Sequence, residues 1–179
     1  MRTTTLVLAV FLLTGGTALA QERYDVSAGY RFMRSEGVSY PAGWYFDATA
    51  HLNTLLSVVG EVGGAYKSDS IDAGTFSQSV DARVHTFMGG VKARAVTMDE
   101  DVIAFGQALF GVANQKLTTT SGSTKLSRAT TDPALSLSVG VDVNDFPVGL
   151  RFQIGWVRAF EEGEGSNVFH FSVGARFGF

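Results

Sequence analysis

The sequence has no cysteine, few charged residues and no long apolar run beyond its first 20 residues. Without cysteine the chain forms no disulfide, and it has no site for a lipid anchor at the start of the mature protein. A membrane-spanning helix needs about 20 apolar residues. The longest apolar stretch after residue 20, from Val102 to Ala113, is shorter and is interrupted by Gln107. These absences argue against a lipoprotein and against a helical membrane protein.

The first 20 residues have the three parts of a secretory signal peptide. Arg2 is followed by the apolar run from Leu6 to Leu13 and by Ala18-Leu19-Ala20, an A-x-A cleavage site. A buried N-terminal helix is the alternative, but the run is short and the three parts come in the expected order. We expect cleavage before Gln21, which leaves residues 21–179 as one domain. One of the 14 basic residues is then lost, so 13 remain against 17 acidic ones, a net charge of −4. That balance gives no reason to expect a nucleic-acid partner.

The C-terminus alternates strictly between apolar and polar residues. From Phe169 to Phe179 the odd positions are apolar, whereas the even positions include His170, Ser172 and Arg176. A period of two predicts a strand with one apolar face. A terminal strand of a soluble protein frays and would expose its aromatic side chains to water. A closed barrel in a bilayer offers lipid on one side and a polar interior on the other. An edge strand of a soluble β-sandwich is the alternative.

The same alternation recurs along the whole mature chain. We predict eight strands, at Tyr24–Met33, Trp44–His51, Leu55–Tyr66, Val84–Arg94, Val102–Ala113, Leu135–Asp142, Leu150–Trp156 and Val168–Phe179. The fifth is apolar on both faces, so a buried helix competes there, although Gly106 and Gly111 weaken a helix. We assign its outward face so that Gln107 points inward. The outward faces of all eight strands then carry no charged residue, and the inward faces are rich in glycine and serine.

The predicted fold is an all-β, antiparallel, up-and-down eight-stranded transmembrane β-barrel. Small inward residues fit the crowded interior of such a barrel. The connections between the strands alternate in length, and the longest are residues 67–83 and 114–133. Outer-membrane barrels have long extracellular loops and short periplasmic turns. We therefore expect both termini in the periplasm and the long connections outside the cell.

The terminal strand resembles that of bacterial outer-membrane barrels, which commonly ends in phenylalanine. The stretch from Ser138 to Asp142, followed by Leu150-Arg151-Phe152-Gln153, is similar to a strand pair of the small eight-stranded families of the OmpA transmembrane-domain, OmpX and OmpW kind. The resemblance implies a protein of the Gram-negative outer membrane and a C-terminal signal for the barrel-assembly machinery, at Phe169, Phe171, Phe177 and Phe179. No further domain is expected after Phe179, and we expect a monomer.

The inward charges are the main candidate site. We predict a lumen network in which Asp47, Glu61 and Asp142 pair with Lys92, Arg151 and Arg176. Unpaired charges in a narrow interior are costly, so pairing is expected. Asp25, Arg31 and Arg94 also face inward under the same assignment. The network either plugs the lumen or forms a gate whose pairs switch to let ions pass, and we favour the plug.

Catalysis and metal binding have weaker support. His170 and Ser172 resemble the His-x-Ser pair of lipid A deacylases, which are also outer-membrane barrels, but that pair faces lipid and needs an acidic residue downstream. Here both residues face inward and no acid follows Ser172. His51, His85 and His170 have no metal-ligand spacing. We expect no cofactor, no metal and no enzyme activity.

The leading function is thus a structural or surface-interaction barrel, in contact with outer-membrane lipids. The threonine-rich connection with Lys116, Lys125 and Arg128 is a candidate contact for the phosphates of lipopolysaccharide. The alternative is a mobile, solvated loop. A narrow channel or carrier for small or hydrophobic solutes is the second functional reading, and an enzyme is the third.

Overall fold

The computed structural model describes residues 23–35, 37–73, 76–96, 101–121, 124–144, 148–160 and 165–179. The expected signal peptide, residues 1–20, lies outside the described residues. Within these ranges no helix is long and apolar enough to cross a membrane.

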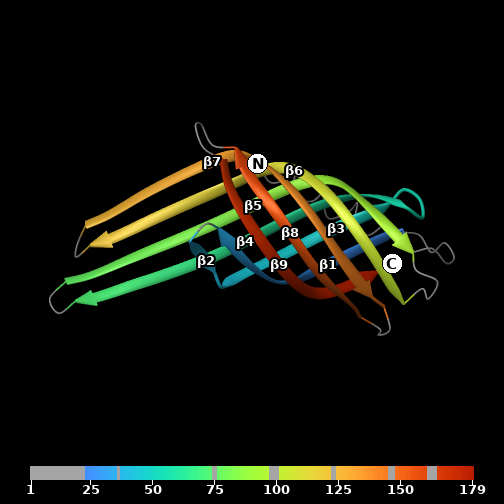
Figure 1. Cartoon of the computed structure of the whole chain (residues 1–179), viewed down its shortest axis with the longest axis horizontal. Coiled ribbons are helices and arrows are strands. Elements are labelled where there is room, and N and C mark those ends of the chain that lie inside the picture. The colour runs from blue at the N-terminus through green and yellow to red at the C-terminus, as the bar shows by residue number, and fades with distance from the viewer. Residues whose placement is uncertain are drawn as a thin grey trace, which may run out of the picture.

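The described chain is all strand and turn, and it closes into an antiparallel barrel (Figure 1). Eight long strands follow one another around the barrel in chain order, and β9 pairs with β1 to close it, for example at Val26 and Phe177. The predicted fold class is confirmed. The strands are β1 Tyr24–Ser35, β2 Val38–Tyr40, β3 Ala42–His51, β4 Leu56–Ala73, β5 Phe76–Val96, β6 Val102–Ser121, β7 Thr124–Val143, β8 Gly149–Phe160 and β9 Gly165–Gly178.

The alternation of the sequence explains which side of each strand faces the lumen. On β3, Phe46 is 42% exposed whereas its neighbour Asp47 is fully buried. On β8, Phe152 is 37% exposed and Arg151 is fully buried. The assigned inward and outward faces of the eight predicted strands agree with the burial pattern except at two residues of the third: Gly64 is covered by the ring of Trp44, and Leu55 lies in the turn before β4. Apolar side chains therefore cover the outer wall, and the charged side chains of the barrel strands face the lumen.

The short strand β2 corrects the expectation of a plain connection at residues 34–43. It pairs with the end of β1, and after Pro41 the chain continues directly into β3. The ladder shifts by one residue there, because Tyr30 pairs with Trp44 but Met33 pairs with Tyr40. Gly43 sits in this irregular stretch, where an added Cβ would lie 2.2 Å from the backbone oxygen of Arg31.

Two of the expected long loops are wrong, because those residues are extended hairpins. Strand β4 runs on to Ala73 and β5 begins at Phe76, while β6 runs to Ser121 and β7 begins at Thr124. Pairing between β5 and β6 continues out to Gln78 and Ser121, so the four strands form one sheet. Figure 1 shows this sheet projecting from one end of the barrel. We call it the projecting sheet, and the opposite end of the barrel, with its short connections, the turn end.

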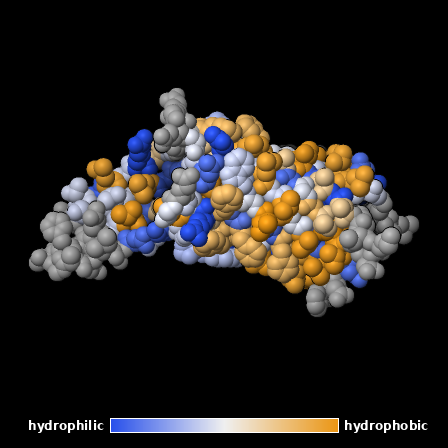
Figure 2. Space-filling model, in the orientation of Figure 1, coloured by the Kyte–Doolittle hydropathy of each residue, from blue (hydrophilic) through white to orange (hydrophobic). Residues whose placement is uncertain are grey.

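The outer surface divides along the same axis. In Figure 2 hydrophobic residues gather over the barrel, and hydrophilic residues dominate around the base of the projecting sheet. Exposed apolar residues of the barrel include Phe110, Val139, Ile154 and Phe171. An apolar belt around a closed barrel is what a bilayer requires of its spanning segment.

Candidate functional site: the closed lumen

Charged side chains fill the lumen near the turn end of the barrel. Eight charged residues of the described chain are at most 4% exposed: Asp25, Arg31, Asp47, Glu61, Lys92, Asp142, Arg151 and Arg176. Four are acidic and four are basic, so the group is neutral as a whole. All six residues of the predicted network lie in it, together with Asp25 and Arg31. We call these eight residues the lumen cluster.

Arg151 is the centre of the lumen cluster. Its guanidinium binds Asp142 with two nitrogens, at 2.7 and 2.8 Å, in the bidentate geometry that suits arginine and carboxylate. A third nitrogen donates to both carboxylate oxygens of Asp47, each at 2.8 Å. Asp25 lies 3.3 Å away. One buried arginine thus connects three acidic residues from three strands, β1, β3 and β7.

The strand register explains why these groups meet. Asp142 and Arg151 face each other directly across β7 and β8. Strands β1 and β9 are joined when the barrel closes, and Arg176 then reaches both Asp25, at 3.4 Å, and Asp142, at 3.6 Å. Cross-strand pairs of opposite charge stabilise a sheet, and here they are also shielded from water.

Lys92 joins the lumen cluster from β5. Its ammonium donates to Thr49 at 2.9 Å and lies 3.8 Å from Asp47. The ring of Phe105 lies 5.1 Å from the Lys92 ammonium and 5.0 Å from the guanidinium of Arg151. An aromatic face attracts a cation at this distance, so Phe105 lies against both like charges.

Glu61 contacts a different base from the predicted ones. It accepts a hydrogen bond from Arg31 at 2.7 Å and lies 3.4 Å from the amide nitrogen of Gln107. Arg31 also donates to the hydroxyl of Ser172 at 2.9 Å and lies over the ring of Tyr45. This pair forms a second layer, further from the turn end than Arg151. Glu61 was expected to pair with Lys92, Arg151 or Arg176. These three bases instead contact Asp25, Asp47 and Asp142.

Apolar side chains also pack in the lumen, beginning beside this pair, where Met88 faces Glu61 across β4 and β5, and continuing toward the projecting sheet. Buried side chains pack together there from β4 to β8, at Val59, Met88, Leu109, Ala113, Ala134, Val157 and Ala159. We call this packed layer the apolar collar. The inward faces were expected to be polar, so this layer was not predicted, although the inward-facing Val59, Met88 and Leu109 indicate it. A cavity of about 30 Å³ remains at the collar's outer edge, enough for roughly one water molecule.

The lumen therefore has two barriers in series. The apolar collar begins beside the Arg31–Glu61 pair and continues toward the projecting sheet, and the other six residues of the lumen cluster occupy the lumen nearer the turn end. An ion crossing the lumen would have to separate buried ion pairs, which costs several kcal/mol for each uncompensated charge. The geometry supports closure of the lumen in this state.

The candidate catalytic pair lies inside the barrel. His170 is 4% exposed and Ser172 is fully buried. Ser172 accepts its hydrogen bond from Arg31, and neither ring nitrogen of His170 has a hydrogen-bond partner among the described residues. Gly155 makes room for the imidazole, since a Cβ there would lie 2.5 Å from its Nε2. The arrangement lacks the base-to-nucleophile hydrogen bond that activates a serine.

Metal-binding groups are equally sparse in the described ranges. They contain no group of three or more histidine, cysteine or acidic side chains placed to hold a metal ion. His51 instead lies against the lumen cluster, with its Nε2 2.9 Å from Asp25 and its Nδ1 2.7 Å from Ser57.

The four predicted C-terminal signal residues lie on the outer wall. Phe169, Phe171, Phe177 and Phe179 on or next to β9 are all exposed, between 44% and 65%. The basic residues Lys116, Lys125 and Arg128 are exposed on the projecting sheet and not on a loop.

Comparison with known proteins supports the fold and nothing finer. No family model matches the chain, and no curated protein sequence matches it. Solved structures do match. The crystal structure of Ail, the attachment invasion locus protein of Yersinia pestis, aligns with a TM-score of 0.59 at 17% identity, covering 88% of this chain and all of that one. The chain has the fold of an outer-membrane β-barrel.

Two further structures show how widely this fold is used. Neisserial surface protein A aligns with a TM-score of 0.55 at 14% identity, over 87% of this chain and 96% of that one. The outer membrane protease OmpT of Escherichia coli aligns at 0.53 and 8% identity, over 90% of this chain and 99% of that one. A protease is among the neighbours, so the fold alone does not decide between a catalytic and a non-catalytic protein.

Proposed function

We propose that this protein is a non-catalytic barrel of the bacterial outer membrane with a structural or surface-interaction role. The observation that carries the proposal is the lumen, which the neutral lumen cluster and the apolar collar both fill. A filled lumen offers no path for solutes and no internal cleft for a substrate. The projecting sheet then remains as the part of the molecule able to meet partners outside the membrane.

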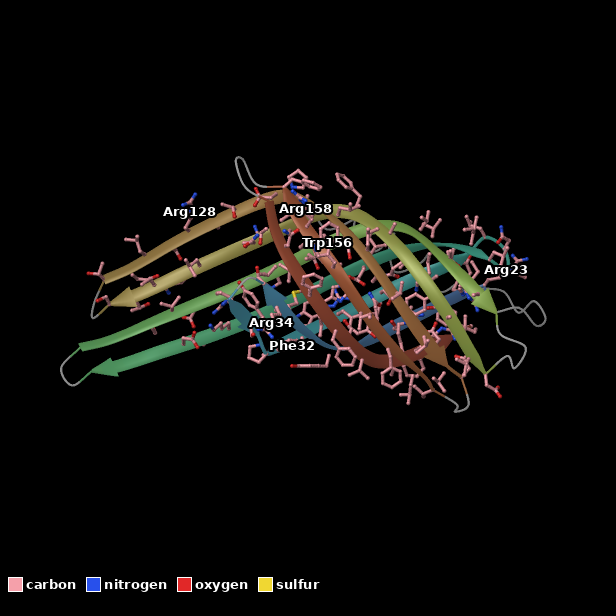
Figure 3. The ribbon with its side chains drawn as sticks, in the orientation of Figure 1. Arg23, Phe32, Arg34, Arg128, Trp156 and Arg158 are labelled. Carbon is pink, nitrogen blue, oxygen red and sulfur yellow. The ribbon has the colours of Figure 1, made fainter. Side chains whose placement is uncertain are left out.

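The projecting sheet has the properties of an exposed surface element. It extends beyond the apolar belt, and its accessible residues are mainly threonine, serine and charged side chains. Lys116, Lys125 and Arg128 are exposed on it, and Figure 3 shows Arg128 well outside the barrel. We propose that these cations contact lipopolysaccharide phosphates, which attract lysine and arginine as point charges.

The route to the membrane follows from the two ends of the sequence. We propose export by the signal peptide at residues 1–20 and insertion of residues 21–179 by the barrel-assembly machinery. The exposed stripe of Phe169, Phe171, Phe177 and Phe179 on β9 supports the second step, because it is accessible along the strand that closes the barrel. The barrel closes on itself through β1 and β9, so one chain is sufficient for the fold, and we propose that the barrel is monomeric.

The orientation in the membrane gives the first prediction. A single cysteine at Ser121, at the tip of the projecting sheet, should react with a membrane-impermeant maleimide on intact cells. A single cysteine at Asn53, in the turn between β3 and β4, should react only after the outer membrane is permeabilised. The chain has no native cysteine, so each variant reports one position. Labelling of Asn53 on intact cells would overturn the proposed orientation.

A further inference from the structure

A shallow trough runs diagonally across the outer wall of the barrel. It lies between two neighbouring cross-strand rows of outward side chains and has a volume of about 920 Å³. One row passes through Leu56 on β4, Gly106 on β6 and Ile154 on β8 to Phe32 on β1. The other includes Ala108 and Trp156. The rows of a tilted barrel climb along its wall, so the trough rises from the turn end toward the projecting sheet.

Small residues line the trough on the side of β5 and β6. Ala93, Gly106 and Ala108 form its floor there, and the larger Val91, Val139 and their neighbours form its sides. Its lining is almost entirely apolar. Its lining residues Val91, Val139 and Ile154 are exposed apolar residues of the outer wall, so a lipid acyl chain is the molecule that this surface meets in a membrane.

The upper end of the trough carries a cation. Arg34 on β1 lines it, beside Trp156 and Phe169, and Figure 3 shows Phe32, Arg34 and Trp156 on the same side of the barrel. Arg34 is exposed and makes no ion pair or hydrogen bond with any described side chain. The outward faces of the eight predicted strands carry no charge, so Arg34 marks the point on β1 where the apolar wall ends.

We infer that the trough binds one lipid of the outer leaflet, with a phosphate of its headgroup on Arg34 and an acyl chain that passes Trp156 and extends along the trough toward the small-residue floor. The inference rests on the proposed outer-membrane location and names a lipid partner for the barrel wall. A guanidinium binds phosphate oxygens through paired hydrogen bonds, and Trp156 supplies the amphipathic ring that favours the interface between chain and headgroup. The class of ligand is a phosphorylated lipid with net negative charge.

Tryptophan fluorescence tests this directly, because Trp156 lines the trough and the other tryptophan, Trp44, lies away from it on β3. The Trp44→Phe variant leaves Trp156 as the single reporter, and Trp156→Phe leaves Trp44. Each variant is reconstituted in phosphatidylcholine vesicles that contain a small fraction of a brominated lipid, either phosphatidylglycerol or phosphatidylcholine. The brominated chains quench tryptophan fluorescence on contact. Trp156 should prefer the anionic lipid about fivefold, the ratio that about 1 kcal/mol from one partly exposed ion contact supplies. Trp44 should show no preference.

Three variants separate the charge from the trough. In the Trp44→Phe background, Arg34→Gln should abolish the preference at Trp156. Arg83→Gln, which removes an exposed cation of the projecting sheet, should leave it unchanged. Ala108→Phe fills the floor with an apolar side chain that lipid tolerates, so it should preserve folding but reduce quenching. Ala48→Phe, an outward substitution on β3 outside the trough, is its matched control.

Competition identifies the ligand. Unlabelled diphosphorylated lipid A should relieve the quenching of Trp156, whereas inorganic phosphate at the same phosphate concentration should not. Equal relief by inorganic phosphate would replace the lipid site with a free-anion site. Equal preference at Trp156 and Trp44, or a preference that survives Arg34→Gln, would refute the lipid site while leaving the barrel in the membrane. Weak quenching of both tryptophans by every brominated lipid would instead contradict the proposed membrane location.

Discussion

Replacing Arg151 with alanine is expected to lower the free energy of unfolding by about 3–5 kcal/mol, the usual cost of breaking a buried ion pair from one side. The substitution removes the shared partner of Asp47 and Asp142 and one of the partners of Asp25. These carboxylates would keep their burial and lose most of their compensation. Lys92 and Arg176 remain nearby but contact the same acids at longer distances, 3.4 to 3.8 Å.

Urea unfolding in lipid vesicles, followed by tryptophan fluorescence, measures this effect. Arg83→Ala is the matched control, because it removes an exposed arginine of the projecting sheet and should change stability by less than about 0.5 kcal/mol. The double variant Arg151→Ala with Asp142→Ala should be less unstable than the sum of the two single variants. A loss below 1 kcal/mol for Arg151→Ala would show that the lumen cluster is not the structural centre of the barrel.

Replacing Val139 with arginine is expected to cost about 2–4 kcal/mol if this residue lies near the bilayer midplane. Val139 is 57% exposed on the outer wall and belongs to the apolar belt. An arginine there would place its charge in hydrocarbon. The penalty should decrease in bilayers of shorter acyl chains, because the side chain then reaches the interface more easily.

Ala129→Arg is the control for this prediction. Ala129 lies on the same face of the same strand, β7, but on the projecting sheet. Arginine there stays in water, and its proximity to Lys116 costs only a few tenths of a kcal/mol. Equal stability of the two variants in vesicle unfolding would mean that the outward face of β7 does not meet lipid.

The fold was predictable because apolar and polar residues alternate within each barrel strand. Alternation at Phe46 and Asp47, or at Arg151 and Phe152, is enough to assign a lumen side and a lipid side. The closure of eight strands then follows from their number and from the small inward residues. Neither step needs contacts between residues far apart in the sequence, since every strand in a membrane barrel must place apolar residues toward lipid.

The projecting sheet was not predictable by the same rule. Described side chains are accessible on both faces of this sheet, for example Lys125 and Leu126, and residues 67–83 and 114–133 lack the alternation that marks the barrel strands. Their β propensity was the available signal, for instance in the run Thr118-Thr119-Thr120. Pro133 marks the transition, since β7 pairs with β8 from the next residue, Ala134, onward.

The membership of the lumen cluster was easier to predict than its contacts. Inward position and charge identify Asp47, Lys92 and Arg151 from the sequence. The pairing of Glu61 with Arg31 depends on the stagger of the barrel, which brings β1 beside both β3 and β9. The apolar collar was not predicted because the lumen was expected to be polar along its whole length. Closely packed apolar side chains close a lumen as well as paired charges do.

Conductance in planar lipid bilayers tests the central claim, a lumen that is closed at rest. The unmutated protein should give little or no stepwise current, because an ion would have to pass both the apolar collar and the lumen cluster. The variant with both Arg151→Ala and Arg176→Ala should leak, since Asp25, Asp47 and Asp142 would then recruit water. Large, regular openings from the unmutated protein would contradict the plug and support a narrow channel.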